Sequence, residues 1–430
     1  MKLIGIDIGT TSICGVVVDP ETGEITKSKT LPNTSFLKSE NDFERIQNPE
    51  IIMNTVCNLI DFLDAKDASA IGFSGQMHGI VYVDENGKAV SPLYTWQDER
   101  AAKEYENGKS YAQKIGCFAG YGLATDFYNE KNGLVPANAK YLCTIADYAV
   151  MCLCGIKKPL VHITNAASLG CFDIKKNCFT VDNSRLPDVT AEFSVAGIYN
   201  GIPVCVALGD NQASFIGSVS DADDALINVG TGSQISWLTE NPVFADGVEN
   251  RPFDGERYLA AGCALCGGRA FAMLEGFFRE IASLAGTDIN SLYPQIDKLL
   301  ETKTETALLA DCRFCGTRNE PSRRGSFSNV SENNFTPADF ALAVLNGMAG
   351  ELYEMYKGGG KSANKLVCSG NGIRKNAALR RITSDMFGCE IKIPLYEEEA
   401  SYGAALAASV ACGMNVNINE ACKLIRYRES

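Results

Sequence analysis

Apolar runs that end in glycine and hydroxyl residues recur along this chain, and the first of them opens the sequence. Residues 3–8 are apolar except for Asp7, and a second β-branched run follows at 13–18. The turn between the two runs consists of Gly9, Thr10, Thr11 and Ser12. This pattern predicts two antiparallel strands joined by a tight turn, whose many N–H and O–H donors are typical of phosphate binding. Because a lone acid would repel phosphate, Asp7 predicts a Mg²⁺ ion between them.

A second segment, residues 227–233, matches residues 6–12 position by position. Its turn consists of Gly230, Thr231 and Gly232, and an apolar run follows at 235–238. Asn228 stands where the first copy has Asp7, so only the first turn is expected to hold a metal. Two such hairpins predict two similarly folded halves that close on one nucleotide. Two unrelated Gly-Thr hairpins are the alternative, which the matched flanks disfavour.

The remaining pattern alternates strands with helices, which favours an α/β fold. Apolar residues at helical spacing predict helices at 49–63, 270–284 and 337–356, and we expect 101–160 to be mainly helical, with 139–153 as the best stretch. Strands are predicted at 25–31, 70–74, 365–368 and 390–394, and a buried strand is predicted at 202–208. The pattern restarts near residue 200 without a low-complexity linker, so we expect domains at 1–200 and 201–430 that share a cleft and hinge near 198–203.

The composition argues against some classes of binding partner. The 430 residues carry a net charge of −13 and a pI near 4.9, which disfavours nucleic acid or an anionic membrane. The sequence shows no run of eighteen apolar residues and no basic-then-apolar leader, so we expect a cytoplasmic protein. Its 17 cysteines lie mostly in apolar runs and are expected to be reduced. Two CxxC pairs, Cys263/Cys266 and Cys312/Cys315, leave a zinc site as a minor alternative.

Polar residues follow the strand predicted at 70–74. Gln76 and His78 lie between glycines just beyond it, where open α/β sheets collect their ligands. Farther along, Trp96 offers an aromatic face and Asp98 a carboxylate, a pair suited to a sugar. A structural histidine, a core tryptophan and a helix-capping aspartate are the alternatives, and the residues alone leave them open.

A further acid, Asp210, follows the strand predicted at 202–208 and precedes a helix that we expect to begin at Gln212. The helix dipole at this place favours an ionised carboxylate. Such an acid is either a helix N-cap or a catalytic base, and the local pattern does not decide between the two.

Five motifs in this order resemble the FGGY family of carbohydrate kinases, within the actin/Hsp70-like ATPase superfamily. They are residues 5–12, 209–212, 228–233, 369–376 and 399–404. The resemblance extends from residue 3 to about residue 408. It implies two ribonuclease H-like domains of the actin/Hsp70 type, with mixed sheets flanked by helices and a ligand cleft between them. It also implies ATP and Mg²⁺ as cofactors.

The resemblance assigns a role to each matching residue. Asp210 would be the catalytic base and, with Asp7, would position the metal. The sugar would be bound by Gln76, Met77, His78, Trp96, Asp98 and Asp210. The nucleotide would be bound by Gly9, Thr10, Thr11, Ser12, Gly230, Thr231, Gly232, Gly267, Gly268, Gly370, Asn371, Gly372 and Asn376.

Within the family, residues 75–79 and 96–98 are similar to the ketose kinases xylulokinase and sedoheptulokinase, and residues 252–255 and 267–270 are most similar to sedoheptulokinase. The implied reaction is phosphorylation of a terminal hydroxyl of a ketose, with sedoheptulose as the preferred candidate. The protein is expected to be a monomer or a homodimer. A xylulose or ribulose kinase is the alternative, and an ATP-driven conformational protein is a more distant one. One departure is Cys14, where the family often has a basic residue, which puts nucleotide affinity in doubt.

Overall fold

The protein, described by a computed structural model at residues 1–361 and 363–428, divides into two compact units. Of the described residues, the first unit contains 1–220, 251–258 and 398–426, and the second contains those of 221–250, 259–397 and 427–428. The first unit therefore takes two segments from the second half of the chain. As a functional division, domains at 1–200 and 201–430 stay a prediction. Within the described residues, no helix has the length and apolar character to cross a bilayer.

A mixed sheet forms the centre of the first unit. Its strands run in the order β15-β16-β5-β1-β2-β3, and β17 also pairs with β5. Their bounds are β1 Leu3–Ile8, β2 Ser12–Val18, β3 Ile25–Pro32, β5 Ala70–Gly75, β15 Val195–Tyr199, β16 Ile202–Cys205 and β17 Leu208–Gly209. β1 is antiparallel to β2 and parallel to β5, which confirms the first predicted hairpin. Because side chains alternate along a strand, Leu3, Gly5 and Asp7 share one face of this sheet.

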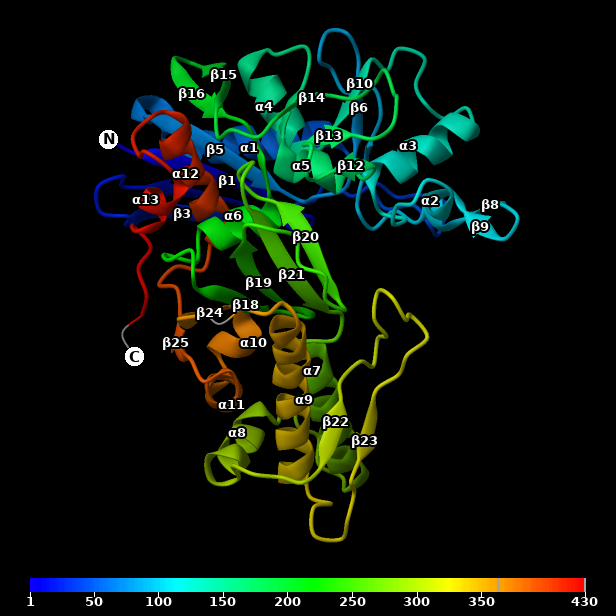
Figure 1. The fold of residues 1–430 in the computed structure, drawn as a ribbon, viewed down its shortest axis with the longest axis vertical. Helices are drawn as coiled ribbons and strands as arrows, with labels where there is room; N and C mark the ends of the chain where they lie inside the picture. The colour runs from blue at the N-terminus through cyan, green and yellow to red at the C-terminus, as the bar shows by residue number, and fades with distance from the viewer. Residues whose placement is uncertain (362, 429–430) are drawn as a thin grey trace. The chain divides into compact units, whose positions relative to one another are not determined.

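Helices cover both faces of the first sheet. On one face, α1 (Pro49–Leu63) and α4 (Ile145–Cys154) bury apolar side chains against the alternate isoleucines of β1. The other face carries α12 (Glu399–Ala411), which packs on β1, β5 and α6 (Asp210–Ile216) (Figure 1). Glycine makes this approach feasible: a Cβ at Gly5 would lie 1.7 Å from the Ser401 carbonyl oxygen, and one at Gly72 would lie 1.9 Å from that of Ala404.

The segment 101–160 is less helical than its pattern predicts. The expected helix at 139–153 is wrong over its first residues, because β10 (Tyr141–Cys143) occupies them and pairs with β6 (Val81–Val83). Thr144 then caps α4 through a capping box with Asp147, so the hydroxyl fixes where the helix begins. The other elements of this segment are β8 Glu104–Glu106, β9 Lys109–Ser110, α2 Tyr111–Lys114 and α3 Gly122–Lys131.

Short elements connect the sheet to the site. They are β4 Ile46–Gln47, β7 Leu93–Tyr94, β11 Leu160–His162, α5 Ile163–Ser168, β12 Phe172–Asp173, β13 Cys178–Phe179, β14 Asp188–Thr190 and α13 Ile418–Cys422. Among them α5 matters most for the site. The Thr164 hydroxyl oxygen accepts the N–H of Gly209 at 3.1 Å, so this helix supports the residue just before Asp210.

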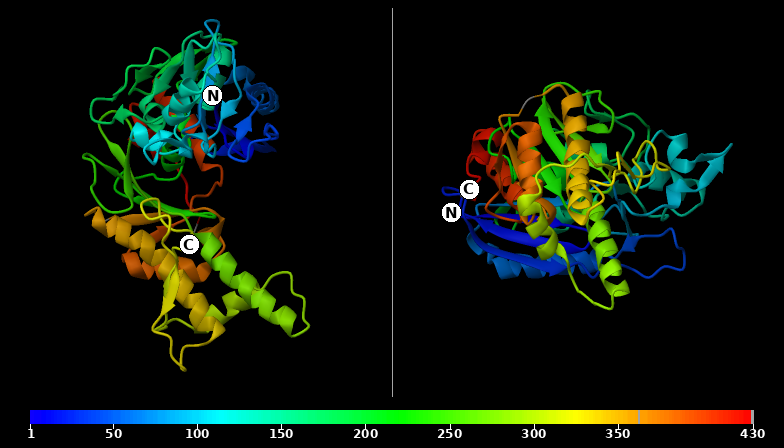
Figure 2. Two further views of the ribbon diagram at one scale, coloured as in Figure 1. Left: turned by 90° about the vertical axis from the view of Figure 1, so that its right-hand side faces the viewer. Right: turned by 90° about the horizontal axis from the view of Figure 1, so that it is seen from below.

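The second unit has its own mixed sheet, in the order β20-β21-β19-β18-β24-β25. Its strands are β18 Ala225–Val229, β19 Ser233–Thr239, β20 Val248–Pro252, β21 Tyr258–Ala264, β24 Lys365–Ser369 and β25 Glu390–Lys392. Its helices are α7 Gly268–Leu284, α8 Tyr293–Thr302, α9 Pro337–Gly358, α10 Asn371–Arg374 and α11 Ala377–Phe387, and a hairpin joins β22 Leu309–Asp311 to β23 Ser326–Ser328. Helix α9 packs on β19, and α7 and α11 lie against α9 (Figure 2). The second predicted hairpin, β18 with β19, is confirmed.

Candidate active site

Asp7 is fixed by a hydroxyl on the neighbouring strand. It lies in register with Ser74 of the parallel strand β5, and the Ser74 hydroxyl donates to Asp7 Oδ1 at 2.7 Å. Burial raises the pKa of Asp7, and the bond from Ser74 opposes this rise. The carboxylate is therefore held in one orientation while one of its oxygens remains for another ligand.

Asp210 begins α6, on the other side of the same central strand. Leu208 and Gly209 of β17 pair with Ser74 and Gly75 of β5, so the carboxyl ends of β1 and β17 flank one strand end. Gly209 is the N-cap of α6, without a side-chain capping bond. Since the Asp210 side chain does not cap the helix, the N-cap interpretation is not supported and the interpretation as a base remains.

The surroundings of Asp210 suit a general base. Burial and, to a smaller extent, the negative charge of Asp7 raise the pKa of Asp210 to about 7, while the charge of Arg251 opposes the rise. Asn211 Nδ2 donates to Asp210 Oδ1 at 3.0 Å. A carboxylate whose pKa lies near the operating pH is efficient at accepting a proton. Arg251 keeps the ionised form accessible.

The repulsion between Asp7 and Asp210 also fits a divalent cation. Both carboxyl groups have raised pKa values, and each oxygen donor is of the type that Mg²⁺ prefers. Over the residues with described positions, no cluster of three or more His, Cys, Asp or Glu side chains could form an all-protein metal site. The donor set therefore fits Mg²⁺, which usually binds to one or two carboxylates and completes its shell with waters and phosphate oxygens.

The first turn directs its carbonyl oxygens into the protein. Asn33 Nδ2 donates to the Gly9 oxygen at 2.9 Å, and the Asn33 N–H donates to the Thr11 oxygen at 2.8 Å. Gln47 Nε2 donates to the Thr10 oxygen at 2.8 Å. With these oxygens bound, the opposite, N–H edge of the turn is the side that an anion can approach.

A ring of hydrogen bonds joins this turn to the residues predicted to bind sugar. Trp96 Nε1–H donates to Thr10 Oγ1 at 3.0 Å, and the Thr10 hydroxyl donates to Gln76 Oε1 at 3.2 Å. Gln76 Nε2 donates to Gln47 Oε1 at 2.8 Å, and Gln47 Nε2 donates to the Thr10 carbonyl oxygen, which closes the ring. The Thr10 hydroxyl proton is thus directed to Gln76 and its carbonyl oxygen is bound by Gln47, so a phosphate would approach the backbone N–H of Thr10.

The neighbours of Gln76 have distinct surroundings. Met77 is buried, and its sulfur accepts Asn211 Nδ2 at 3.5 Å, so it supports the start of α6. His78 has a left-handed backbone with φ 71°, a conformation uncommon outside glycine that points to a functional constraint. Its imidazole stacks on Tyr121 with ring centroids 4.4 Å apart.

The carboxylate of Asp98 is bound by other residues of the protein. Its carboxylate is fully buried and accepts Arg100 Nε at 2.7 Å and the Arg45 N–H at 3.1 Å. Trp96, by contrast, is 46% exposed and lines a cavity of 440 Å³. The Asp98 oxygens are bound within the protein and so hold the loop that presents Trp96, and the binding of a sugar hydroxyl by Asp98 stays a prediction.

The turn of the second unit is built on the same plan. The N–H of Gly268 donates to the Gly230 oxygen at 3.0 Å, and the N–H of Arg269 donates to the Thr231 oxygen at 3.1 Å. The Gly232 oxygen accepts the Gly230 N–H at 2.9 Å. The first turn of α7 therefore satisfies the Gly230 and Thr231 carbonyls, a role that Asn33 and Gln47 perform in the first unit.

Glycines allow the predicted nucleotide residues of the second unit to gather at the end of β18. A Cβ at Gly268 would lie 2.5 Å from the Gly230 oxygen, and one at Gly267 would lie 2.5 Å from the Gly232 carbonyl carbon. Gly370 (φ 83°) and Gly372 lie equally close to Val229, and Asn371 begins α10. Asn376 Oδ1 accepts the Leu379 N–H and so caps α11.

Comparisons with known proteins agree with this geometry. The N-terminal domain of the FGGY family of carbohydrate kinases matches residues 2–217, and its C-terminal domain matches residues 225–412. The chain belongs to the FGGY family of carbohydrate kinases. The Mus musculus sedoheptulokinase is 25% identical over 94% of this chain and 96% of that protein. The Lactococcus lactis xylulose kinase is 23% identical over 100% of this chain and 91% of that protein.

A solved structure supports the fold of this FGGY kinase. The Plasmodium falciparum glycerol kinase with ADP superposes with a TM-score of 0.82, at 20% identity, over 100% of this chain and 93% of that one. The predicted fold class, with mixed sheets flanked by helices in two actin/Hsp70-type domains, is confirmed. The ligand cleft between the domains stays a prediction.

The sequence did not identify three residues as part of the candidate site: Gln47, Ser74 and Arg251. One signal was available, because Ser74-Gly75 and Ser369-Gly370 end equivalent strands in the two units. Gln47 and Arg251 lie in segments without a recognisable pattern, and only the fold brings them to the site. Cys14, which replaces a basic residue, accepts the Ser401 hydroxyl at 3.6 Å.

Proposed function

We propose that this FGGY kinase transfers the γ-phosphoryl group of ATP to a terminal hydroxyl of a ketose, and that sedoheptulose is the substrate. The observation that carries the proposal is Asp210, an acid at the start of α6 whose pKa of about 7 results from burial and from Asp7. A conformational ATPase needs no such base. The FGGY family models, which cover nearly the whole chain, weigh against that alternative as well.

In this mechanism Asp210 accepts the proton of the attacking hydroxyl group as the new P–O bond forms. Arg251 keeps Asp210 ionised, and Asn211 orients the carboxylate. The exposed Trp96 ring packs on the C–H groups of the sugar, and His78 binds a sugar hydroxyl. The N–H edges of the two turns bind the phosphates. When bound, Mg²⁺ held by Asp7 would offset charge on the β- and γ-phosphates.

Sedoheptulose is proposed because sedoheptulokinases of Mus musculus and Homo sapiens are 25% and 26% identical to this chain. A pentulose kinase is the second candidate, and the full-length match to the Lactococcus lactis xylulose kinase supports it. The ring around Thr10 is compatible with either sugar, since it fixes Gln76 and Trp96 without setting the length of the pocket. We further propose that the protein acts in the cytoplasm.

A panel of ketoses from five to seven carbons, with ATP and Mg²⁺, tests the substrate. We expect the highest kcat/KM with sedoheptulose, and mass spectrometry with product NMR should place the phosphate on the terminal oxygen. Faster turnover of xylulose or ribulose would replace sedoheptulose with a pentulose. ADP release that no ketose stimulates would contradict the kinase proposal.

The variant Asp210→Asn tests the mechanism. Asparagine keeps the shape of the side chain and cannot accept the proton, so turnover should fall by at least about 100-fold, the usual contribution of a general base. Sugar binding, measured by calorimetry, should persist. Turnover near that of the wild type would remove Asp210 from its role.

A further inference from the structure

Two cysteines far apart in sequence, Cys117 and Cys171, lie in contact in the first unit. Their Sγ atoms are 3.3 Å apart, compared with about 2.05 Å in a disulfide. Both are free thiols. The bond from the Cys117 thiol lowers the pKa of Cys171 to about 7. Because the thiolate is the reactive form, Cys171 is the nucleophile of this pair.

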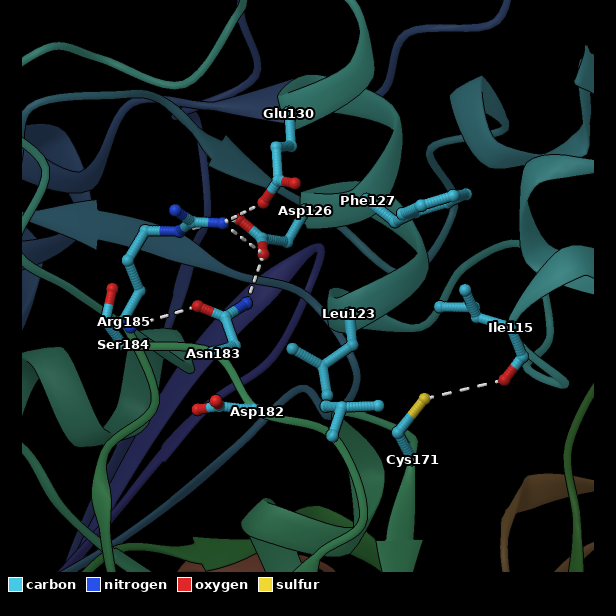
Figure 3. A pocket seen from close by; sticks show the side chains of 11 residues that line it. Ile115, Leu123, Asp126, Phe127, Glu130, Cys171, Asp182, Asn183, Ser184 and Arg185 are labelled. Atoms are coloured by element: carbon cyan, nitrogen blue, oxygen red, sulfur yellow. Dashed lines mark hydrogen bonds and ion pairs between the residues drawn. The ribbon is translucent and has the colours of Figure 1, made fainter.

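A cavity of 310 Å³ gives access to Cys171. Cys171 lies at one end of it, and Arg185 lies with Asp126 and Glu130 at the other (Figure 3). Arg185 is already bound to both acids, at 2.9 and 2.8 Å, and Asp182 also lines the wall. Such an acidic cavity favours a small neutral oxidant, such as hydrogen peroxide, over an anionic one.

Each of the two cysteines is close in sequence to a residue that contacts His78. Cys171 comes three residues after Ser168, whose hydroxyl oxygen accepts the His78 N–H at 3.1 Å and whose carbonyl oxygen lies 2.8 Å from His78 Nδ1. Cys117 comes four residues before Tyr121, whose ring stacks on the imidazole with 7° between the planes. A movement of either cysteine therefore reaches His78 through a short stretch of chain.

The backbone between these contacts has little room to absorb a movement. A Cβ at Gly170 would lie 2.7 Å from Cys117 Sγ and 3.1 Å from the Tyr121 ring. Cys171 itself has a left-handed backbone with φ 48°, which is strained for a residue other than glycine. Drawing the sulfurs together must then displace Ser168, Tyr121 or both.

We propose that Cys117 and Cys171 are a peroxide-sensitive modification site, whose disulfide displaces the supports of His78 and weakens sugar binding. The second half of this statement rests on the proposed function. The Cys171 thiolate attacks one peroxide oxygen and the O–O bond breaks, giving a sulfenic acid and hydroxide. The Cys117 sulfur then attacks the sulfenic sulfur, the S–S bond forms, and the C–S–OH oxygen leaves as water. Overall, two thiols are oxidised and one hydrogen peroxide is reduced to two waters.

The full-length protein, treated with one equivalent of hydrogen peroxide and alkylated, tests the modification by peptide mass spectrometry. We expect a cross-linked peptide pair that contains residues 117 and 171, and it should disappear in Cys117→Ser and in Cys171→Ser. The matched control is Cys178→Ser, an exposed cysteine close in sequence, which should retain the cross-link. Glutathione disulfide, which is anionic, should react more slowly than peroxide. Random oxidation of exposed cysteines without a 117–171 cross-link would overturn the site.

Kinetics test the connection to His78. In oxidised protein the KM for the ketose should rise by about fivefold to tenfold, as for the loss of one polar contact, and dithiothreitol should restore it. Cys117→Ser should show no such change with peroxide. A cross-link that leaves the KM unchanged would overturn the connection. Because the cross-link is read by mass, a protein that phosphorylates no ketose would contradict the proposed function and leave the modification site standing.

Discussion

The two hairpin turns of this protein perform the same structural task with different groups. In the first unit, Ser74 donates to Asp7, and in the second, Asn228 donates to Ser369, at 2.7 and 2.8 Å. Both pairs lie in register on parallel neighbouring strands. The direction of the hydrogen bond reverses because a carboxylate only accepts, whereas an amide can also donate. A single change of side chain therefore gives one turn a charge suited to a metal and leaves the other neutral.

The turns also differ in how their carbonyl oxygens are satisfied. Side chains of Asn33 and Gln47 bind those of the first unit, whereas backbone N–H groups at the start of α7 bind those of the second. A side-chain arrangement can be linked to other side chains, and the first turn is joined in this way to Gln76 and Trp96. A backbone arrangement depends on glycine, as Gly268 shows. The first turn is therefore linked through side chains to residues proposed to bind the sugar, whereas the second is held by backbone hydrogen bonds.

Exchanging the two residues that distinguish the turns should have the largest effect. In Asp7→Asn, the new amide can donate to Ser74 as Asn228 does to Ser369, so the fold should persist. Turnover should fall by at least about 100-fold, because several kcal/mol of charge stabilisation depend on the metal. The measurement is kcat as a function of Mg²⁺ concentration, with circular dichroism to verify folding.

The reverse exchange, Asn228→Asp, is the matched control. It places a negative charge at the turn proposed to bind only phosphate, so ATP affinity should fall while the Mg²⁺ dependence stays unchanged. Wild-type turnover of Asp7→Asn at every Mg²⁺ concentration would show that the two turns do not differ in the way proposed here.

The second turn should be sensitive to a single methyl group. In Gly268→Ala the new Cβ would meet the Gly230 carbonyl oxygen, a backbone atom that cannot turn away, so the turn must shift. We expect ATP affinity to fall by about tenfold, which corresponds to about 1.4 kcal/mol, with sugar affinity unchanged. Calorimetric titration with ATP and with the ketose separates the two.

Gly276→Ala provides the control on the same helix. A Cβ there would approach only the Arg279 side chain, at 3.8 Å, and alanine in a helix is favoured over glycine by about 1 kcal/mol. This variant should bind ATP normally and unfold at a slightly higher temperature. Equal losses of ATP affinity in both variants would indicate a general effect of α7 instead of the contact with Gly230.

The sequence predicted the parts of the site that lie on repeated or periodic segments. Both hairpins and α1 follow from the local apolar pattern, whereas the single strand expected at 202–208 is divided into β16 and β17. The places of Gln47 and Arg251 in the site could not be predicted, because their partners Thr10 and Asp210 lie tens of residues away and no local pattern marks them. The sequence shows Asp98 and Arg100 two residues apart, but only the structure shows that the guanidinium binds the carboxylate.

The ring of the first turn should respond more moderately to a substitution. Gln47→Leu keeps the volume of the side chain but removes the partners of the half-buried Thr10 carbonyl and of the buried Gln76 amide. Leaving a buried polar group without a partner costs about 1–3 kcal/mol, so the melting temperature should fall and the ketose KM should rise by about fivefold. Gln295→Leu makes the same change at an exposed site of α8 and should alter neither. A normal KM in Gln47→Leu would show that the ring is not needed to place Gln76.

The smallest effect concerns the dependence of stability on pH, and it distinguishes the acid Asp210, whose pKa is raised in part by Asp7, from the neutral Asn228. The folded pKa of Asp210, about 7, lies above its ordinary value of 3.8, so the native state favours the protonated form. Stability should therefore be highest below about pH 4 as far as this group is concerned, and should be lost as the pH rises through 7. Asp210→Asn removes the charge, so without Mg²⁺ it should melt about 3 °C above the wild type at pH 8 and show almost no difference at pH 4. Differential scanning fluorimetry across this range measures the change, and the exposed Asp67→Asn should show no such pH dependence.

Since Asn228 carries no charge, Asn228→Ala should shift the melting temperature equally at both pH values. A pH-independent difference for Asp210→Asn would mean that Asp7 and burial do not hold the proton on Asp210.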